Sequence, residues 1–299
     1  MKPHRWTVAS RLCAASLVST LAGGVLVSGQ QLPNEPAKKF GASITPAYEG
    51  WFDNPDGTHS FLVGYLNRNR AQEDDIPIGP NNQIEPGGPD RGQPTHFLPG
   101  RQIGVFVITV PKEFTPQQRV TWTITMNGQS NSIPFHMQPD YNISPFAEIA
   151  VHNTPPVIRF DETGQTVQGP LASAVKPLAS RTTSVSAPLP LTIWAEDDAK
   201  YTNGSGAPIR NPPPPPVTLT WSKFRGPGTV TFDKPKPALD KLAGGLVNQP
   251  YKGKASTTAK FSEPGEYVLH ATANDYSGVG GGGFQCCWTT AVLKVSVTP

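Results

Sequence analysis

The stretch VTWTITMNG, residues 120–128, decides the fold class of this chain. Val120, Trp122 and Ile124 alternate with threonines, which is the period of a half-buried β-strand with one apolar and one polar face. The Asn-Gly pair that ends the stretch is the strongest short-range signal for a two-residue hairpin turn. The alternation then resumes in residues 133–137, so the pattern predicts an antiparallel hairpin that covers a core.

The flanking segments extend this prediction to a whole domain. Residues 48–52 and 60–66 are strand-like, and the turn sequence DNPDG at 53–57 between them predicts a second hairpin. Residues 103–110 are continuously apolar, as expected for a central strand that is covered on both faces. We therefore predict an all-β, sandwich-type domain over residues 44–152.

Residues 153–299 carry a second set of strand patterns, in which apolar residues recur with a period of two. A Trp on an early strand and a Tyr at the start of a late strand are typical of immunoglobulin-like sandwiches. The patterns predict a second β-sandwich of this kind. The residues expected to face its core are Leu189, Leu191 and Ile193; Val217, Leu219 and Trp221; Tyr267, Leu269, Ala271 and Ala273; and Leu293, Val295 and Val297.

Four motifs of this second half resemble a known family. They are NTPPV at 153–157, TWSK at 220–223 followed by GPGTVTF, TTAKFSEPGEYVL at 257–269, and ATAND at 271–275. Their order is similar to that in polycystic-kidney-disease-type (PKD) repeats of bacterial secreted and surface proteins. The resemblance covers about half of the chain and implies an immunoglobulin-like module with a non-catalytic spacer, adhesion or ligand-binding role. Insertions near 199–211 and 234–253 and a glycine-rich loop at 278–283 depart from the pattern.

The N-terminal segment predicts export. Residues 1–29 combine Lys2, Arg5 and Arg11 with an uncharged, apolar stretch, which is the pattern of a secretory signal peptide, and residues 30–43 are expected to be a polar tether. Without the segment, 22 of the 25 basic residues remain against 22 acidic ones. A neutral chain has no global attraction for nucleic acid. We expect a periplasmic, cell-surface or secreted protein that meets the membrane only through its export signal.

One candidate metal site stands out among the acidic residues. Glu196, Asp197 and Asp198 end one predicted strand and Asp275 ends another, so both ends can lie at one pole of the sandwich. Clustered carboxylates suit Ca²⁺, and calcium is the one cofactor we expect. A solvated acidic surface explains the same residues equally well.

Cys286 and Cys287 are neighbours, and three states compete for them. An oxidising compartment favours disulfides, although a trans peptide holds neighbouring Cα atoms about 3.8 Å apart, closer than disulfides usually require. We predict a vicinal disulfide first, two free thiols second, and a metal site or intermolecular crosslink third.

No catalytic motif emerges, so we expect an exported, non-catalytic binding, adhesion or structural protein that meets a protein or carbohydrate at the cell exterior. The alternative is a secreted hydrolase with its site in the long loop of residues 67–102. That loop offers Asp74, Asp75 and His96. A loop of this length inside a domain is usually functional or disordered.

Overall fold

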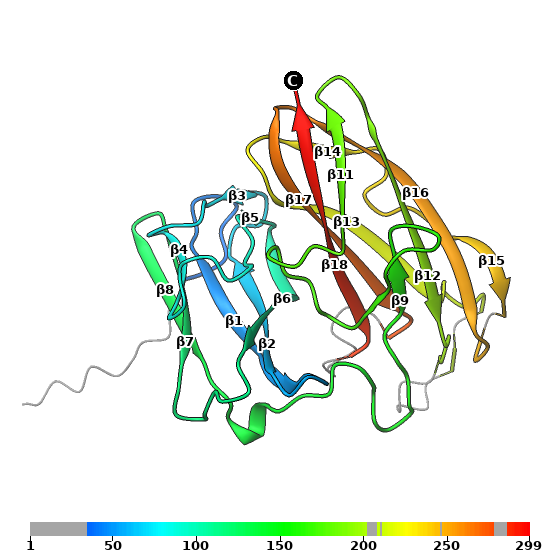
Figure 1. Ribbon diagram of the computed structural model, residues 1–299, viewed down its shortest axis with the longest axis horizontal. Helices are drawn as coiled ribbons and strands as arrows, with labels where there is room; N and C mark the ends of the chain where they lie inside the picture. Colours follow the sequence, from blue (N-terminus) through cyan, green and yellow to red (C-terminus); the bar gives the residue numbers. More distant parts are fainter. Residues whose placement is uncertain (1–34, 202–207, 210, 246, 278–285) are drawn as a thin grey trace, which may run out of the picture. The chain divides into compact units, whose positions relative to one another are not determined.

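The computed structural model describes residues 35–201, 208–209, 211–245, 247–277 and 286–299. Apart from a short 3-10 turn, the regular elements of these residues are β-strands, and they form several sheets (Figure 1). The chain is therefore an all-β protein of sandwich type, as the alternation predicted.

The first sandwich is built from two antiparallel three-stranded sheets. Val120, Trp122 and Ile124 are buried between them, and the Phe106 ring meets the edge of Trp122 at 5.2 Å between centroids. The turn after Met126 adopts positive φ at both central residues, which confirms the predicted hairpin. One sheet consists of β1 (Ile44–Asp53), β2 (His59–Asn67) and β6 (Gly100–Val110), and the other of β4 (Asn82–Glu85), β7 (Val120–Met126) and β8 (Gln129–Phe135).

The loop of residues 67–102 contains structure that its sequence did not indicate. Strand β4 lies inside it and pairs with β7, and the two-residue strands β3 (Asp74–Asp75) and β5 (His96–Phe97) pair with each other. These strands are too short to establish a visible period of two. The 3-10 turn η1 (Pro139–Tyr141) follows the sandwich.

The end of the predicted polar tether, residues 42–43, is buried against the first sandwich, whereas residues 36–41 are exposed. The Asn69 side chain accepts a hydrogen bond from the Ala42 backbone N–H at 2.7 Å and donates one to its carbonyl at 3.1 Å. Ala42 is fully buried as a result. The predicted signal peptide, residues 1–29, lies outside the described residues.

The second sandwich confirms the predicted alternation along its strands, because all of the residues expected to face its core are buried. Its Tyr267 hydroxyl accepts from Gly228 N–H and donates to the Glu263 carbonyl, a corner typical of immunoglobulin-like sandwiches. One sheet contains β9 (Val157–Arg159), β10 (Val167–Gln168), β12 (Leu189–Asp197), β14 (Val230–Phe232), β15 (Asp240–Gly244) and β16 (Tyr251–Phe261); the other contains β11 (Ala179–Ser184), β13 (Val217–Arg225), β17 (Gly265–Asp275) and β18 (Trp288–Thr298).

The two sandwiches share core residues. The core of the first sandwich includes Phe224 from β13, Val292 from β18 and Ala172 from the segment before β11. Residues 35–299 accordingly form one compact unit. Within the described part of the chain, no helix has the length and apolarity needed to cross a membrane.

Candidate functional site

The loop of residues 67–102 meets the second sandwich through a cluster of four ionisable side chains, which we call the charged cluster: Glu73, Asp75, His96 and Lys223. Lys223 Nζ donates to Asp75 Oδ1 at 3.0 Å, although the two residues are 148 positions apart. The Lys223 side chain is only 7% exposed, so its charge needs this partner. The charged cluster therefore binds the loop to strand β13.

His96 belongs to the charged cluster with both of its ring nitrogens. Its Nδ1 lies 3.0 Å from Asp75 Oδ1 and its Nε2 lies 3.2 Å from Glu73 Oε2. A general base needs a ring nitrogen that is free to accept a proton from a nucleophile. With carboxylates at both nitrogens, His96 has none in this arrangement.

The three loop residues that the hydrolase hypothesis requires, Asp74, Asp75 and His96, do not form one group. Asp75 and His96 are in contact, as that hypothesis requires. Asp74 instead points inward, where Asn67, Asn69 and Gln72 donate hydrogen bonds to its carboxylate. The structure gives Asp74 a role in holding the loop.

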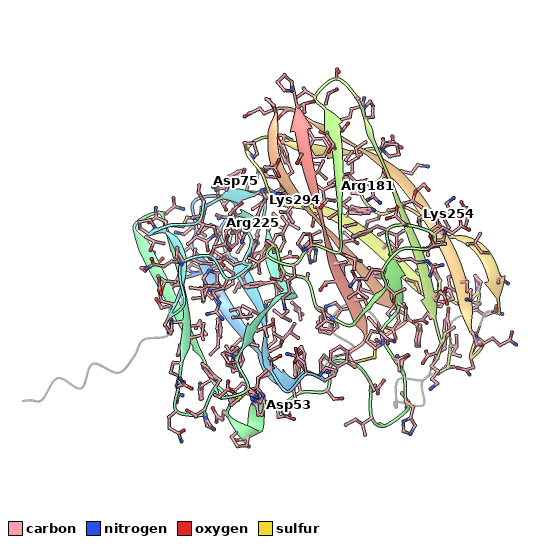
Figure 2. The ribbon with its side chains drawn as sticks, viewed as in Figure 1. Asp53, Asp75, Arg181, Arg225, Lys254 and Lys294 are labelled. Carbon is pink, nitrogen blue, oxygen red and sulfur yellow. A yellow bond between two sulfur atoms is a disulfide. The ribbon has the colours of Figure 1, made fainter. Side chains whose placement is uncertain are left out.

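A second fastening point lies next to the charged cluster. The Arg225 guanidinium donates to both carboxylate oxygens of Asp90, at 2.9 and 2.8 Å, and its Nε donates to the Gln93 carbonyl at 2.8 Å. Bidentate pairs of this kind are the stronger and more directional ion pairs. Asp75 and Arg225, both labelled in Figure 2, mark the two fastening points.

Sequence reasoning missed both basic partners, although one of them carried a signal. Lys223 continues the parity of Val217, Leu219 and Trp221, so it is a charged residue at a position that the strand pattern assigns to the core. A β-bulge between Lys223 and Arg225 then shifts the register of the strand. A lysine at a core position indicates a buried ion pair, but the sequence does not identify its partner.

His270 also lies between the sandwiches, although alternation alone predicts a solvent-facing side chain. It does point away from the core of the second sandwich, but Phe224 stacks on it at 5.4 Å and its Nε2 lies 3.0 Å from the Val105 carbonyl. Burial lowers the pKa of His270 to about 4. A neutral imidazole therefore donates to Val105 across the contact.

The four carboxylates of the predicted calcium site are not one group. Glu196 is paired with Arg159 at 2.9 Å and with Lys252 at 2.8 Å, and the alternation of β12 turns it away from Asp197. Asp198 accepts hydrogen bonds from the backbone and hydroxyl of Thr154. Among the described residues, no group of three or more His, Cys, Asp or Glu side chains is arranged to hold a metal ion.

Three of these residues and an asparagine nevertheless gather at one pole of the second sandwich, which we call the acidic pole: Asp197, Asp198, Asp275 and Asn153. The Asn153 amide donates to Asp275 Oδ2 at 2.5 Å. Asn153 Oδ1 and Asp197 Oδ1 are buried and have no hydrogen-bond partner among the described residues. Asn153 is fully buried and Asp197 is 8% exposed, so both oxygens are costly to leave unpaired.

The acidic pole shifts the proton equilibria of its two buried acids. Burial raises the pKa of Asp197 to about 8, with the charges of Asp275 and Asp198 adding to the shift, and burial raises the pKa of Asp275 to about 6. An acid whose pKa is raised in the native state costs no stability at a pH below the pKa that it has in the unfolded chain, because it is then protonated in both states. These two groups therefore destabilise the native state increasingly as the pH rises from about 4 through 6 to 8.

A disulfide joins Cys286 and Cys287 beside the acidic pole. Both cysteines are buried, and the Sγ of Cys287 lies 3.4 Å from the Asn153 carbonyl. The backbone N–H of Asp275 also donates to the Cys287 carbonyl at 3.3 Å. The cysteine pair thus contacts two residues of the acidic pole.

Comparison with known proteins adds little to this geometry. No family model matches the chain, and no curated protein matches it. The D00-D0 domain of intimin is a similar solved structure with 14% identity and a TM-score of 0.22, covering 84% of this chain and 99% of that one. Domains 4 and 5 of the S-layer protein SbsC are similar at 11% identity and a TM-score of 0.19, covering 86% and 98%. Scores this low carry no argument about function, so the fold rests on the sheets described above.

Proposed function

We propose that this chain is an exported, non-catalytic structural or binding protein of the cell exterior, whose two sandwiches act as a single unit. The observation that carries the proposal is the fastening of the loop of residues 67–102. Asp75, one of the candidates for catalysis, binds Lys223 of the second sandwich, and Asp90 of the same loop binds Arg225. A loop occupied in this way has a structural role.

Two features, one of the sequence and one of the structure, support the proposed location outside the cytoplasm. Residues 1–29 have the pattern of a secretory signal, and a disulfide such as Cys286–Cys287 is favoured in oxidising compartments. We propose that the second sandwich is a PKD-type module and that the partner is a protein or a carbohydrate. Fractionation of the producing cells would place the mature protein outside the cytoplasm.

The rival function is a secreted hydrolase, which the contact between Asp75 and His96 favours. We expect broad hydrolase assays of the mature protein to show no turnover above the blank. Asp75→Ala should instead lower the free energy of unfolding by about 2 to 4 kcal/mol, because it leaves Lys223 buried and unpaired.

Asp53→Ala is the matched control for that experiment. Asp53 is an exposed acid like Asp75, but it pairs with His59 and its removal leaves no buried lysine without a partner, so its loss should change stability by less than about 0.5 kcal/mol. Hydrolysis by the wild type that disappears in Asp75→Ala and persists in Asp53→Ala would overturn the proposal and support the hydrolase.

We propose in addition that the acidic pole binds Ca²⁺. Calcium takes carboxylate and amide oxygens as ligands. The pole offers Asp197, Asp275 and the unpartnered Oδ1 of Asn153, all of them buried. Bound calcium would satisfy oxygens that have no partner among the described residues, and it would offset the repulsion between the two carboxylates.

Calcium at about 5 mM should raise the melting temperature of EDTA-treated protein at pH 8 by several degrees, because a ligand that binds only the native state stabilises it. Asp197→Asn should abolish this rise, whereas Asp161→Asn, which alters an exposed acid paired with Arg181, should retain it. Scanning fluorimetry with magnesium as the control ion measures the shift. No shift in the wild type, or an equal shift in Asp197→Asn, would refute the calcium site.

A further inference from the structure

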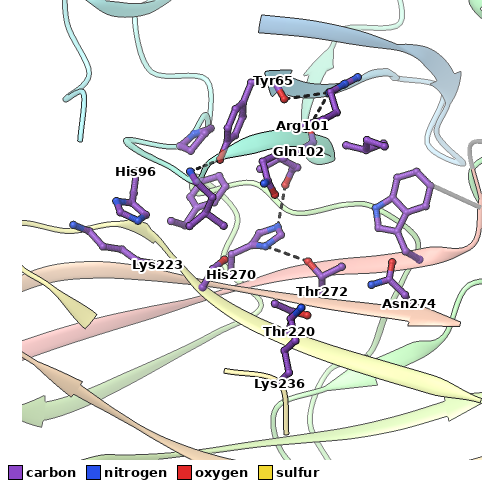
Figure 3. A pocket seen from close by; sticks show the side chains of 17 residues that line it. Tyr65, His96, Arg101, Gln102, Thr220, Lys223, Lys236, His270, Thr272 and Asn274 are labelled. Carbon is purple, nitrogen blue, oxygen red and sulfur yellow. Dashed lines mark hydrogen bonds between the residues drawn. The ribbon is translucent and has the colours of Figure 1, made fainter. Parts of the chain in front are cut away.

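The second sandwich carries a polar face opposite to its core. Along β13 and β17, Thr220 lies opposite Thr272 and Ser222 lies opposite His270. Asn274 of β17 lies opposite Trp288, the first residue of β18. This face borders a pocket of about 270 Å³ whose other side is formed by residues of the first sandwich, among them Arg101, Gln102 and Tyr65 (Figure 3).

Two residues that line this pocket each carry a buried side-chain atom with no hydrogen-bond partner among the described residues. The two atoms are Nε1 of Trp288, which is 1% exposed, and Oδ1 of Asn274, which is 6% exposed. Native proteins rarely bury such groups unpaired, and each instance needs an explanation such as a bound molecule. One atom is a donor and the other an acceptor, so together they match a ligand that accepts at one position and donates a hydroxyl at another.

The structure holds the indole in its place. Gly104 of β6, at a φ of 53°, faces the Trp288 ring, and a Cβ at this position would overlap the ring. Trp288 also belongs to a small buried apolar cluster with Leu62 and Val107. The Nε1–H group is thus fixed by packing before any ligand arrives, which lowers the cost of binding.

The charged side chains that line the pocket narrow the chemical class of the ligand. Among the described residues no acidic side chain lines it, whereas Arg101, Lys223 and Lys236 do. Arg101 and Lys223 are neutralised by Glu49 and Asp75. Lys236 is exposed and has no hydrogen-bond or ion-pair partner in the described part of the chain, so it provides an uncompensated positive charge at the pocket.

The volume of the pocket sets an upper limit on the size of its ligand. Pockets for drug-sized ligands have volumes of roughly 300 to 1,000 Å³, and this one is slightly smaller. A single sugar ring fits these dimensions. A polymer could place no more than one residue inside.

From these observations we infer that the pocket binds one anionic, hydroxylated ring of the uronic-acid class. Lys236 binds the carboxylate, Trp288 Nε1–H donates to a ring oxygen, and Asn274 Oδ1 accepts from a hydroxyl. The inference rests on the proposed non-catalytic binding role, and it names the ligand class for that role.

Titration with D-glucuronate tests the inference by NMR. The indole N–H cross-peak of Trp288, assigned through its absence in Trp288→Phe, should shift and saturate with a Kd below about 1 mM. D-Glucose should bind at least about tenfold more weakly, because it lacks the carboxylate. Lys236→Met should weaken glucuronate binding by a similar factor, whereas Lys234→Met, on the same loop but outside the pocket lining, should not.

Two outcomes would overturn the inference: no shift of the Trp288 cross-peak, as for a pocket that holds only water, or equal shifts with glucose and in Lys236→Met. The ligand spectrum separates this failure from that of the proposed function. Binding with unchanged glucuronate supports both proposals, whereas binding with conversion of the sugar supports the pocket and refutes the non-catalytic role.

Discussion

Replacing Phe224 with alanine is expected to lower the free energy of unfolding of the mature protein by about 3 to 5 kcal/mol, as truncation of a buried aromatic residue does. Phe224 is 2% exposed and belongs to strand β13, yet it packs in the core of the first sandwich and stacks on His270. Its loss leaves a cavity where the two sandwiches meet. We therefore expect a single transition that moves as a whole to lower denaturant concentration.

Equilibrium unfolding in guanidinium chloride measures this effect. Phe40→Ala is the control, because Phe40 is 56% exposed and its truncation should change stability by less than about 0.5 kcal/mol. A loss below about 1 kcal/mol for Phe224→Ala would show that the side chain does not join the two cores.

Tyr267→Ala is expected to have an effect of similar size, about 3 to 5 kcal/mol, and so is Trp221→Ala in the same core. Tyr267 is fully buried and its hydroxyl makes two backbone hydrogen bonds, to Gly228 and Glu263. Tyr267→Phe keeps the ring and removes the hydroxyl, so it should cost only about 1 to 3 kcal/mol.

Thermal and denaturant melts of the three variants test this order. If Tyr267→Phe proves as damaging as Tyr267→Ala, the hydroxyl and not the ring dominates the corner. If both alanine variants lose less than about 1 kcal/mol, the assigned facing of β13 and β17 is wrong.

The sequence predicted the strands because burial imposes a period of two on them. Trp122 and Ile124 in the first sandwich, and Tyr267 and Leu269 in the second, all face the cores that their parity assigned. Alternation of apolar and polar residues did not reveal the short strands. Strand β4, with only four residues, cannot establish a period, and its pairing with β7 depends on a partner far along the chain.

The candidate sites were predicted less well, for two different reasons. Glu196 and Asp197 are neighbours on a strand, so alternation alone should have placed them on opposite faces. The pairing of Asp75 with Lys223, in contrast, spans 148 positions and carries no local signal. For the same reason alternation alone predicts a solvent-facing His270, because nothing near it in the sequence indicates Val105 as its partner.

The acidic pole could be predicted from the sequence only in part. The strand-end positions predicted that Asp197 and Asp275 lie at the same pole, where the adjacent residues Asn153 and Thr154 hydrogen-bond to Asp275 and Asp198. The contribution of Asn153 was not predicted, because it depends on the path of the linker between the sandwiches. Whether calcium binds there stays a prediction for the melting experiment.

We infer that the two sandwiches of residues 35–299 form one cooperative unit, fastened through the loop of residues 67–102. Differential scanning calorimetry of the mature protein tests it most directly. We predict one transition whose calorimetric enthalpy equals its van't Hoff enthalpy, as for a two-state unit. Two resolved transitions, or a calorimetric enthalpy about twice the van't Hoff value, would show that the sandwiches unfold independently and would contradict the claim.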